Sequence, residues 1–137
     1  MNSIRAQYGL QPLRANPGLA AAAAQHSREM GVDGYFDHNS ANGGAFWQRV
    51  AHWYPQGGFA RWAVGENLVW SSPDLGSSGV VDLWMHSPEH RANILNPRWR
   101  DLGVGERRLV LRHLGLAALR RDKLDQMAVC RLSLIHI

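Results

Sequence analysis

The spacing of apolar residues predicts two helices in the first third of the chain. A short one is expected over residues 2–8. A longer one is predicted from Pro17 to about Met30, because Asn16 can accept hydrogen bonds from the free amides of the first turn and proline fits at its start. The inward side of this helix carries mostly small residues, which permits close packing. The glycines at 31 and 34 are expected to end it.

The pattern from residue 46 onward predicts alternating helices and strands. Ser87 is expected to cap a helix that begins at Pro88 and stops before Pro97. The other expected elements are a helix over 46–53, a strand over 65–70, a helix from 77 or 78 to 85, and a strand over 102–105 that is bounded by glycines.

The tail from residue 106 has a different character from the rest. It carries a leucine and arginine pattern with no aromatic residue between 109 and 128. Residues 132–137 have the sequence that a common transposase adapter of sequencing libraries encodes. One hypothesis is therefore a frameshift after residue 105 and adapter read-through over 132–137, which would leave the sheet without its last strand. The alternative is a genuine amphipathic helix over 109–127.

Composition limits the classes of function. A chain of 137 residues can form one domain with a modest core. The net charge of +4 lies entirely in residues 106–137, whereas residues 1–105 hold eight arginines and eight acidic residues, so we expect no nucleic-acid partner. No apolar run is long enough to span a bilayer, and no signal peptide is visible. Six tryptophans before residue 100 predict a core dominated by aromatic burial.

Three motifs occur in a fixed order along the chain. They are Phe36-Asp37-His38-Asn39-Ser40, then Val64-Gly65-Glu66-Asn67-Leu68, and finally Trp84 to Leu95 with the central run Ser87-Pro88-Glu89-His90-Arg91. Together they resemble the signature of the CAP superfamily, the cysteine-rich secretory, antigen 5 and pathogenesis-related (SCP-like) proteins, and its bacterial branch in particular. The resemblance runs from Asn2 to Gly105.

The resemblance implies an α+β fold of the CAP type. This is a three-layer α-β-α sandwich with helices on both faces of a small, mainly antiparallel sheet. It also implies one domain over residues 1–105, followed by the atypical tail. Bacterial relatives are usually exported, so we expect an extracellular or cell-envelope location. The missing signal peptide then suggests either a lost amino terminus or a domain cut from a longer chain.

The resemblance also implies a central cleft, which in animal and plant members gathers two histidines and two glutamates. His38 and Glu66 match two of these positions, and His90 matches the histidine of the bacterial motif. Such side chains suit zinc or another divalent cation, although no cofactor is required. Asn67 lies beside Glu66, while Glu89 stands where bacterial relatives commonly have glycine.

Each candidate also has a purely structural interpretation. Glu89 can stabilise the positive end of the helix that begins at Pro88. Glu66 and Asn67 can anchor a turn, and His38 and His90 can be hydrogen-bonded packing groups. Arg91 and Asn93 are expected to hold the geometry of the motif. The remaining histidines are expected at the surface or its boundary: His26, His52, His86 and His113.

The leading hypothesis for function is a non-enzymatic module that binds a small apolar ligand or a partner protein. The alternative is a metal-assisted hydrolase of the peptidase kind, with Glu66 as the base and the histidines as ligands. A third hypothesis is a purely structural domain. Ser40 and Ser87 each neighbour a histidine, but no Gly-x-Ser-x-Gly motif accompanies them, which disfavours a serine hydrolase.

Overall fold

The computed structural model describes residues 1–55, 57, 62–110 and 127–136. Over these residues the helices are α1 (Asn2–Gln7), α2 (Pro17–Asp33), α3 (Phe46–Trp53), α4 (Gly76–Met85) and α5 (Pro88–Ile94). The strands are β1 (Arg14–Ala15), β2 (Val64–Ser71), β3 (Asp101–Val110) and β4 (Met127–His136).

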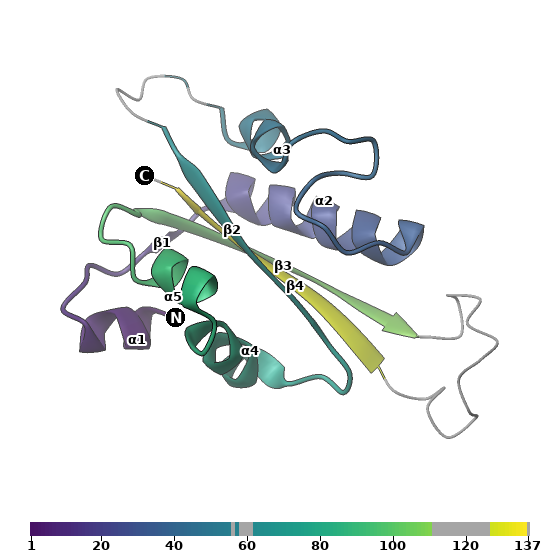
Figure 1. Ribbon diagram of the computed structural model, residues 1–137. Helices are drawn as coiled ribbons and strands as arrows, with labels where there is room; N and C mark the ends of the chain where they lie inside the picture. The colour runs from purple at the N-terminus through teal and green to yellow at the C-terminus, as the bar shows by residue number, and fades with distance from the viewer. Residues whose placement is uncertain (56, 58–61, 111–126, 137) are drawn as a thin grey trace.

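The four strands form one sheet in the order β1-β3-β4-β2 (Figure 1). The short β1 pairs with β3 in parallel, whereas β4 is antiparallel to both of its neighbours. The last strand of the chain is therefore central, and β2 lies at an edge. The mainly antiparallel sheet is as expected.

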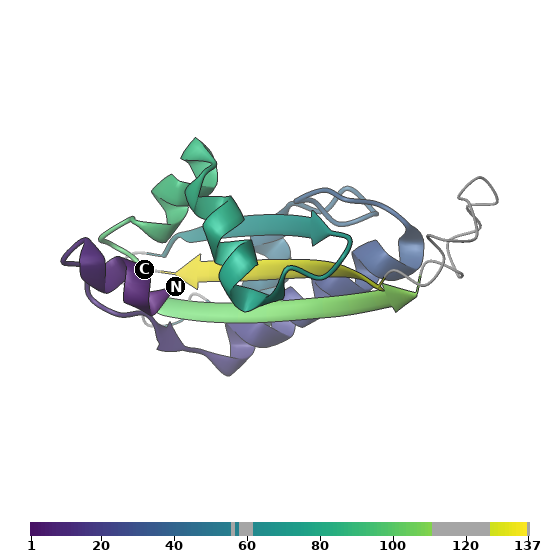
Figure 2. The same ribbon diagram turned by 90° about the horizontal axis from the view of Figure 1, so that it is seen from below.

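Helices cover both faces of the sheet. Figure 2 shows α2 and α3 on one side and α4 and α5 on the other, with α1 near one end. Along β2, Leu68 packs against α2 and α3, while the next residue, Val69, packs against α4 and α5. Successive side chains of a strand point to opposite faces, so β2 is buried on both sides. The expected α-β-α sandwich is confirmed.

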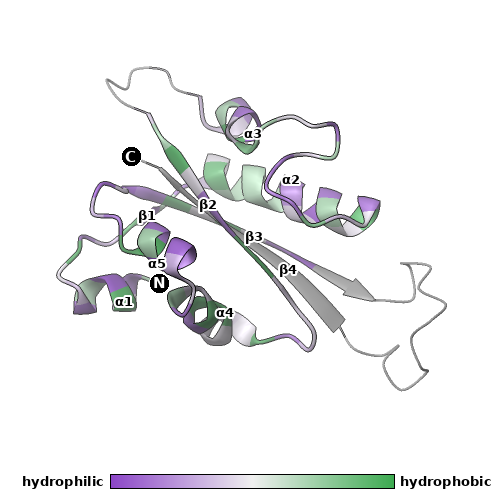
Figure 3. Cartoon of the chain, viewed as in Figure 1, coloured by the Kyte–Doolittle hydropathy of each residue, from purple (hydrophilic) through white to green (hydrophobic). Residues whose placement is uncertain are grey.

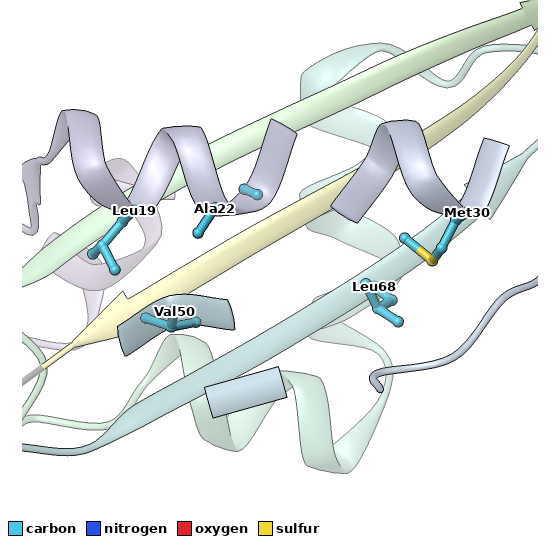
Figure 4. Close-up of a cluster of buried hydrophobic side chains, with 6 residues drawn as sticks. Leu19, Ala22, Met30, Val50 and Leu68 are labelled. Atoms are coloured by element: carbon cyan, nitrogen blue, oxygen red, sulfur yellow. The ribbon is translucent and has the colours of Figure 1, made fainter. Parts of the chain in front are cut away.

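The larger core cluster lies between α2, α3 and β2. Its members are drawn in Figure 4: Leu19, Ala22, Ala23, Met30, Val50 and Leu68. Figure 3 shows a hydrophilic break within the otherwise largely hydrophobic β2, at Glu66 and Asn67. Since both residues are buried, their polar groups need partners inside the protein.

Local signals predicted most helix boundaries. The side chain of Asn16 accepts a hydrogen bond from the Leu19 amide, as its position before Pro17 predicted. In contrast, α2 continues through Gly31 to Asp33 and ends at Gly34, whose φ is +69°. Gly31 is buried there, and its packing offsets the cost of about 1 kcal/mol for glycine within a helix. Ser87 is the residue before α5, but its side chain makes no capping hydrogen bond.

The tail differs from the expectation of a missing last strand. Residues 127–136 form β4, which pairs along its length with both β2 and β3. This run is rich in aliphatic residues and has a strand's length. The helix considered over 109–127 does not form at its ends, where Val110 belongs to β3 and Met127 to β4. Residues 111–126 lie outside the described residues.

Tryptophan burial is less than composition suggested. Trp84 and Trp99 are buried in the core. Trp47, Trp53 and Trp70 are 49%, 43% and 42% exposed. Aliphatic and small side chains therefore make up most of the core around α2, and the prediction of an aromatic core is wrong for half of the tryptophans.

Close contact between α2 and β3 depends on two glycines. A Cβ at Gly103 would overlap the Leu19 carbonyl carbon, and a Cβ at Gly105 would overlap the Ala24 amide nitrogen. Both contacts involve helix backbone, which cannot move aside as a flexible side chain can. The glycines therefore let the helix backbone rest directly on the strand.

We predict that Gly103→Ala lowers the free energy of unfolding by about 3 kcal/mol or more, because the added methyl group must push α2 off the sheet. Urea denaturation would measure the loss. Val104→Ala is the matched control, since Val104 lies between the two glycines and is 52% exposed. Similar losses in the two variants would contradict the prediction.

Candidate functional site

Glu66 is the buried centre of the site. It lies on β2, and its side chain is 1% exposed. Its Oε2 accepts a hydrogen bond of 2.6 Å from Nη2 of Arg49 on α3, whose side chain is 3% exposed. A buried carboxylate is stable only when it is paired and hydrogen-bonded, and Arg49 supplies both the charge and the donor.

His38 meets the other oxygen of the same carboxylate. It comes from the loop between α2 and α3, and its Nδ1 lies 2.8 Å from Oε1 of Glu66. Because a carboxylate only accepts, Nδ1 carries the proton and Nε2 is left free for a ligand. Half of the His38 side chain is exposed, and its ring packs 6.3 Å from that of Phe46. The structure therefore brings His38 and Glu66 together.

The hydrogen bond to Glu66 raises the pKa of His38 above its ordinary value, against the opposing effect of partial burial. The bond is stronger when the imidazole is charged, so the folded protein favours the protonated ring. His38 thus combines a fixed orientation with a pKa raised above its ordinary value.

Asn67 and Asn93 connect β2 to α5. The Asn93 amide donates to Oδ1 of Asn67 at 3.0 Å and to the Glu66 carbonyl at 3.3 Å, and the Asn67 amide donates to the His90 carbonyl at 3.2 Å. Trp84 adds a bond of 2.9 Å from its indole nitrogen to the Leu68 carbonyl. Asn93 and Trp84 thus each donate to a backbone carbonyl of β2, and Asn67 donates to one of α5.

His90 is half-buried on α5, beside Trp84 at a ring separation of 6.5 Å. Its Nδ1 is buried and makes no hydrogen bond. Burial lowers the pKa of His90, and the charge of His38 lowers it further. The His90 ring is therefore disfavoured in its charged form.

The other carboxylate candidate lies apart from this centre. Glu89 is exposed in the first turn of α5. Among the residues that the structure describes, no group of three histidine, cysteine, aspartate or glutamate side chains is placed to hold a metal ion. Glu66 lies behind His38 and orients its ring through the bond to Nδ1.

Comparison with known proteins identifies the family of the chain. The family model of the cysteine-rich secretory proteins (CAP) matches residues 1–106. The chain belongs to the CAP family. The CAP chain is 34% identical over 104 residues to the uncharacterized protein YkwD of Bacillus subtilis, and 32% identical over 104 residues to the uncharacterized membrane protein YlbC of the same bacterium. Each match covers 76% of this chain, but only 38% and 28% of the two relatives.

Solved structures share the fold. An extracellular protein with an SCP domain from Bacillus anthracis matches with a TM-score of 0.67 and 25% identity, over 96% of this chain and 36% of that protein. An outer surface protein from Borrelia burgdorferi matches with a TM-score of 0.61 and 18% identity, over 95% of this chain and 84% of that protein. No helix within the described part of the CAP chain is long and apolar enough to cross a membrane.

Sequence reasoning missed two residues that support His38 and Glu66 in this CAP domain. Arg49 lies outside the three motifs. The only signal in the sequence was its helical spacing from Phe46 and Val50, which is compatible with a position near the inward side of α3. His26 was expected near the surface, but it is fully buried under the loop that carries His38. The expectation for His26 is therefore wrong. The sequence pattern that indicates burial of His26 is its position on the same face of α2 as Ala22 and Met30.

Arg49→Met is predicted to lower the free energy of unfolding by about 3–5 kcal/mol, because it leaves the Glu66 carboxylate buried without a cation. Chemical denaturation at neutral pH would measure the change. Arg28→Met, an exposed position on α2, is the control and should change stability by about 0.5 kcal/mol or less. Equal losses in both variants would contradict the role of the ion pair.

The raised pKa of His38 predicts a pH-dependent contribution to stability. Since the folded pKa lies above the unfolded value of about 6.5, the contribution is complete below that pH and is lost as pH rises through the folded pKa. The stability difference between the native protein and His38→Ala should therefore shrink between about pH 5.5 and pH 9. Denaturation across this range would test it, and a constant difference would contradict it.

Proposed function

We propose that this CAP domain is a non-enzymatic binding module. The observation that carries the proposal is that both oxygens of Glu66 are occupied, by Arg49 at 2.6 Å and His38 at 2.8 Å. A hydrolase of the kind considered from the sequence needs Glu66 as a base within reach of a water molecule. The buried, doubly bonded carboxylate suits orienting a histidine better than accepting a proton from water.

The exposed edge of His38 and the reachable nitrogen of His90 are the groups that would meet a ligand. Neutral imidazole nitrogens are common ligands of zinc and other divalent cations. The structure supports an open site with these two histidines, whose remaining positions would be filled by water or by groups of a second ligand.

Each histidine is also backed by an aromatic ring, His38 by Phe46 and His90 by Trp84. This gives the cleft an apolar component beside its two imidazoles. A small apolar ligand, or an apolar side chain of a partner protein, is therefore the class of molecule that we propose for the space around the cation site.

We place the module outside the cell or on its surface. Two of the proteins that share its fold are described as an extracellular protein and as an outer surface protein. The chain spans less than two fifths of the length of YkwD or YlbC. The binding module is thus proposed as one part of what such longer proteins do.

Zinc titration by calorimetry tests the cation site. We expect the native protein to bind one zinc ion, and His38→Ala and His90→Ala each to bind it at least about tenfold more weakly, since each removes one of two protein ligands. His52→Ala, which removes an exposed histidine of α3, should bind zinc as the native protein does. Absence of zinc binding by the native protein would contradict the cation site.

A second assay separates binding from hydrolysis. The zinc-loaded protein should leave a diverse peptide library intact over many hours, as judged by mass spectrometry. Cleavage that is abolished in both His38→Ala and His90→Ala would overturn the non-enzymatic proposal. It would show that the cleft acts as the alternative, metal-assisted hydrolase.

A further inference from the structure

We infer that His26, a buried histidine on α2, is a positioning residue that holds His38 in the orientation needed to bond Glu66. The inference rests on the proposed function in one respect, because that function has His38 bind the ligand. The placement of His38 itself can be measured without any ligand.

His26 bonds the residue directly before His38. Its side chain is fully buried, and its Nε2 lies 2.8 Å from the backbone carbonyl oxygen of Asp37. A carbonyl only accepts, so Nε2 carries a proton and donates it. This bond fixes the loop from α2 at the peptide that leads into His38.

Arg49 holds the same loop from the other side. Its Nη2 donates to the His38 carbonyl at 3.3 Å and its Nη1 donates to Oγ of Ser40 at 3.1 Å, while Nη2 also bonds Glu66. The backbone of His38 is therefore held at the preceding peptide by His26 and at its own carbonyl by Arg49. Two anchors that flank one residue restrict its rotation far more than one anchor can.

The Nε2–H group of His26 can make this bond whether the ring is neutral or charged, and the two largest influences on the pKa of His26 favour the neutral ring. Burial lowers the pKa of His26, as does the positive charge of Arg49, although the carboxylates of Glu29 and Glu66 act in the opposite direction. The unprotonated Nδ1 lies 3.4 Å from the Tyr35 hydroxyl, which can donate to it. Oε2 of Glu29 lies 3.5 Å from Nδ1 and makes no hydrogen bond.

The orientation of His38 has a direct spectroscopic signature. When Nδ1 faces the Glu66 carboxylate, the neutral ring must carry its proton on Nδ1. A histidine free in solution prefers the other tautomer, with the proton on Nε2. Imidazole ¹⁵N chemical shifts, followed through the titration of His38 until the ring is neutral, distinguish the two forms.

The decisive comparison is between His26→Gln and His26→Asn. The glutamine amide can reach the position of Nε2 and donate to the Asp37 carbonyl, whereas the asparagine amide is too short to do so. We expect His38 to keep the Nδ1–H form in the native protein and in His26→Gln, and to change mainly to the Nε2–H form in His26→Asn.

Ser27→Ala supplies the control for stability alone. Ser27 is also buried on α2, and its hydroxyl bonds the Gly105 carbonyl on β3 at 3.3 Å, away from the loop. This variant should melt at a lower temperature and still keep His38 in the Nδ1–H form. If His26→Asn also keeps that form, Arg49 alone positions His38 and the inference is overturned.

The measurement needs no metal ion. A failure of the native protein to bind zinc would therefore affect the proposed function and leave the tautomer result unchanged. In the same way, an unchanged tautomer in His26→Asn would remove the positioning role without bearing on zinc binding by the native protein.

Discussion

The buried ion pair between Arg49 and Glu66 is the interaction on which the site depends. It joins α3 to β2, and the same guanidinium bonds the loop that carries His38. Burying two charges costs several kcal/mol each, and their attraction offsets this cost only with good geometry. A pair of apolar residues could fill the same space. The charged pair is better explained by what it orients, namely an imidazole whose free nitrogen faces the solvent.

The hydrogen bonds near the polar middle of β2 also protect the backbone of this edge strand. An edge strand presents unpaired carbonyls that can pair with other chains. Here Asn93 and Trp84 donate to two of these carbonyls, those of Glu66 and Leu68. The side chains that protect the edge come from α4 and α5, so the same bonds that close the edge also bring His90 beside the cleft.

Local chemistry made much of the fold predictable. The start of α2 follows from Asn16 and Pro17, and the limits of α3 follow from its apolar spacing. Errors arose where distant contacts decide the outcome. Gly31 remains helical because α2 is packed along the sheet. The 127–136 segment is a strand because β2 and β3 flank it, and no local pattern reveals those neighbours.

The candidate site was predictable only in part for the same reason. The motifs indicated His38, Glu66 and His90, and the structure joins the first two directly. Arg49 and His26 act through bonds to residues of other elements, and their own sequence neighbourhoods contain no sign of these bonds. Supporting residues of this kind are identified by three-dimensional contacts.

The central position of β4 has a consequence for the synthesis of the chain. β2 and β3 are made earlier, yet each pairs along β4, the strand that follows both. While the ribosome is still translating residues 106–126, the inner edges of both strands have no partner in the chain. Contacts between such distant segments form slowly. The pairings that β2 and β3 make with β4 can therefore form only after residues 127–136 have been synthesised.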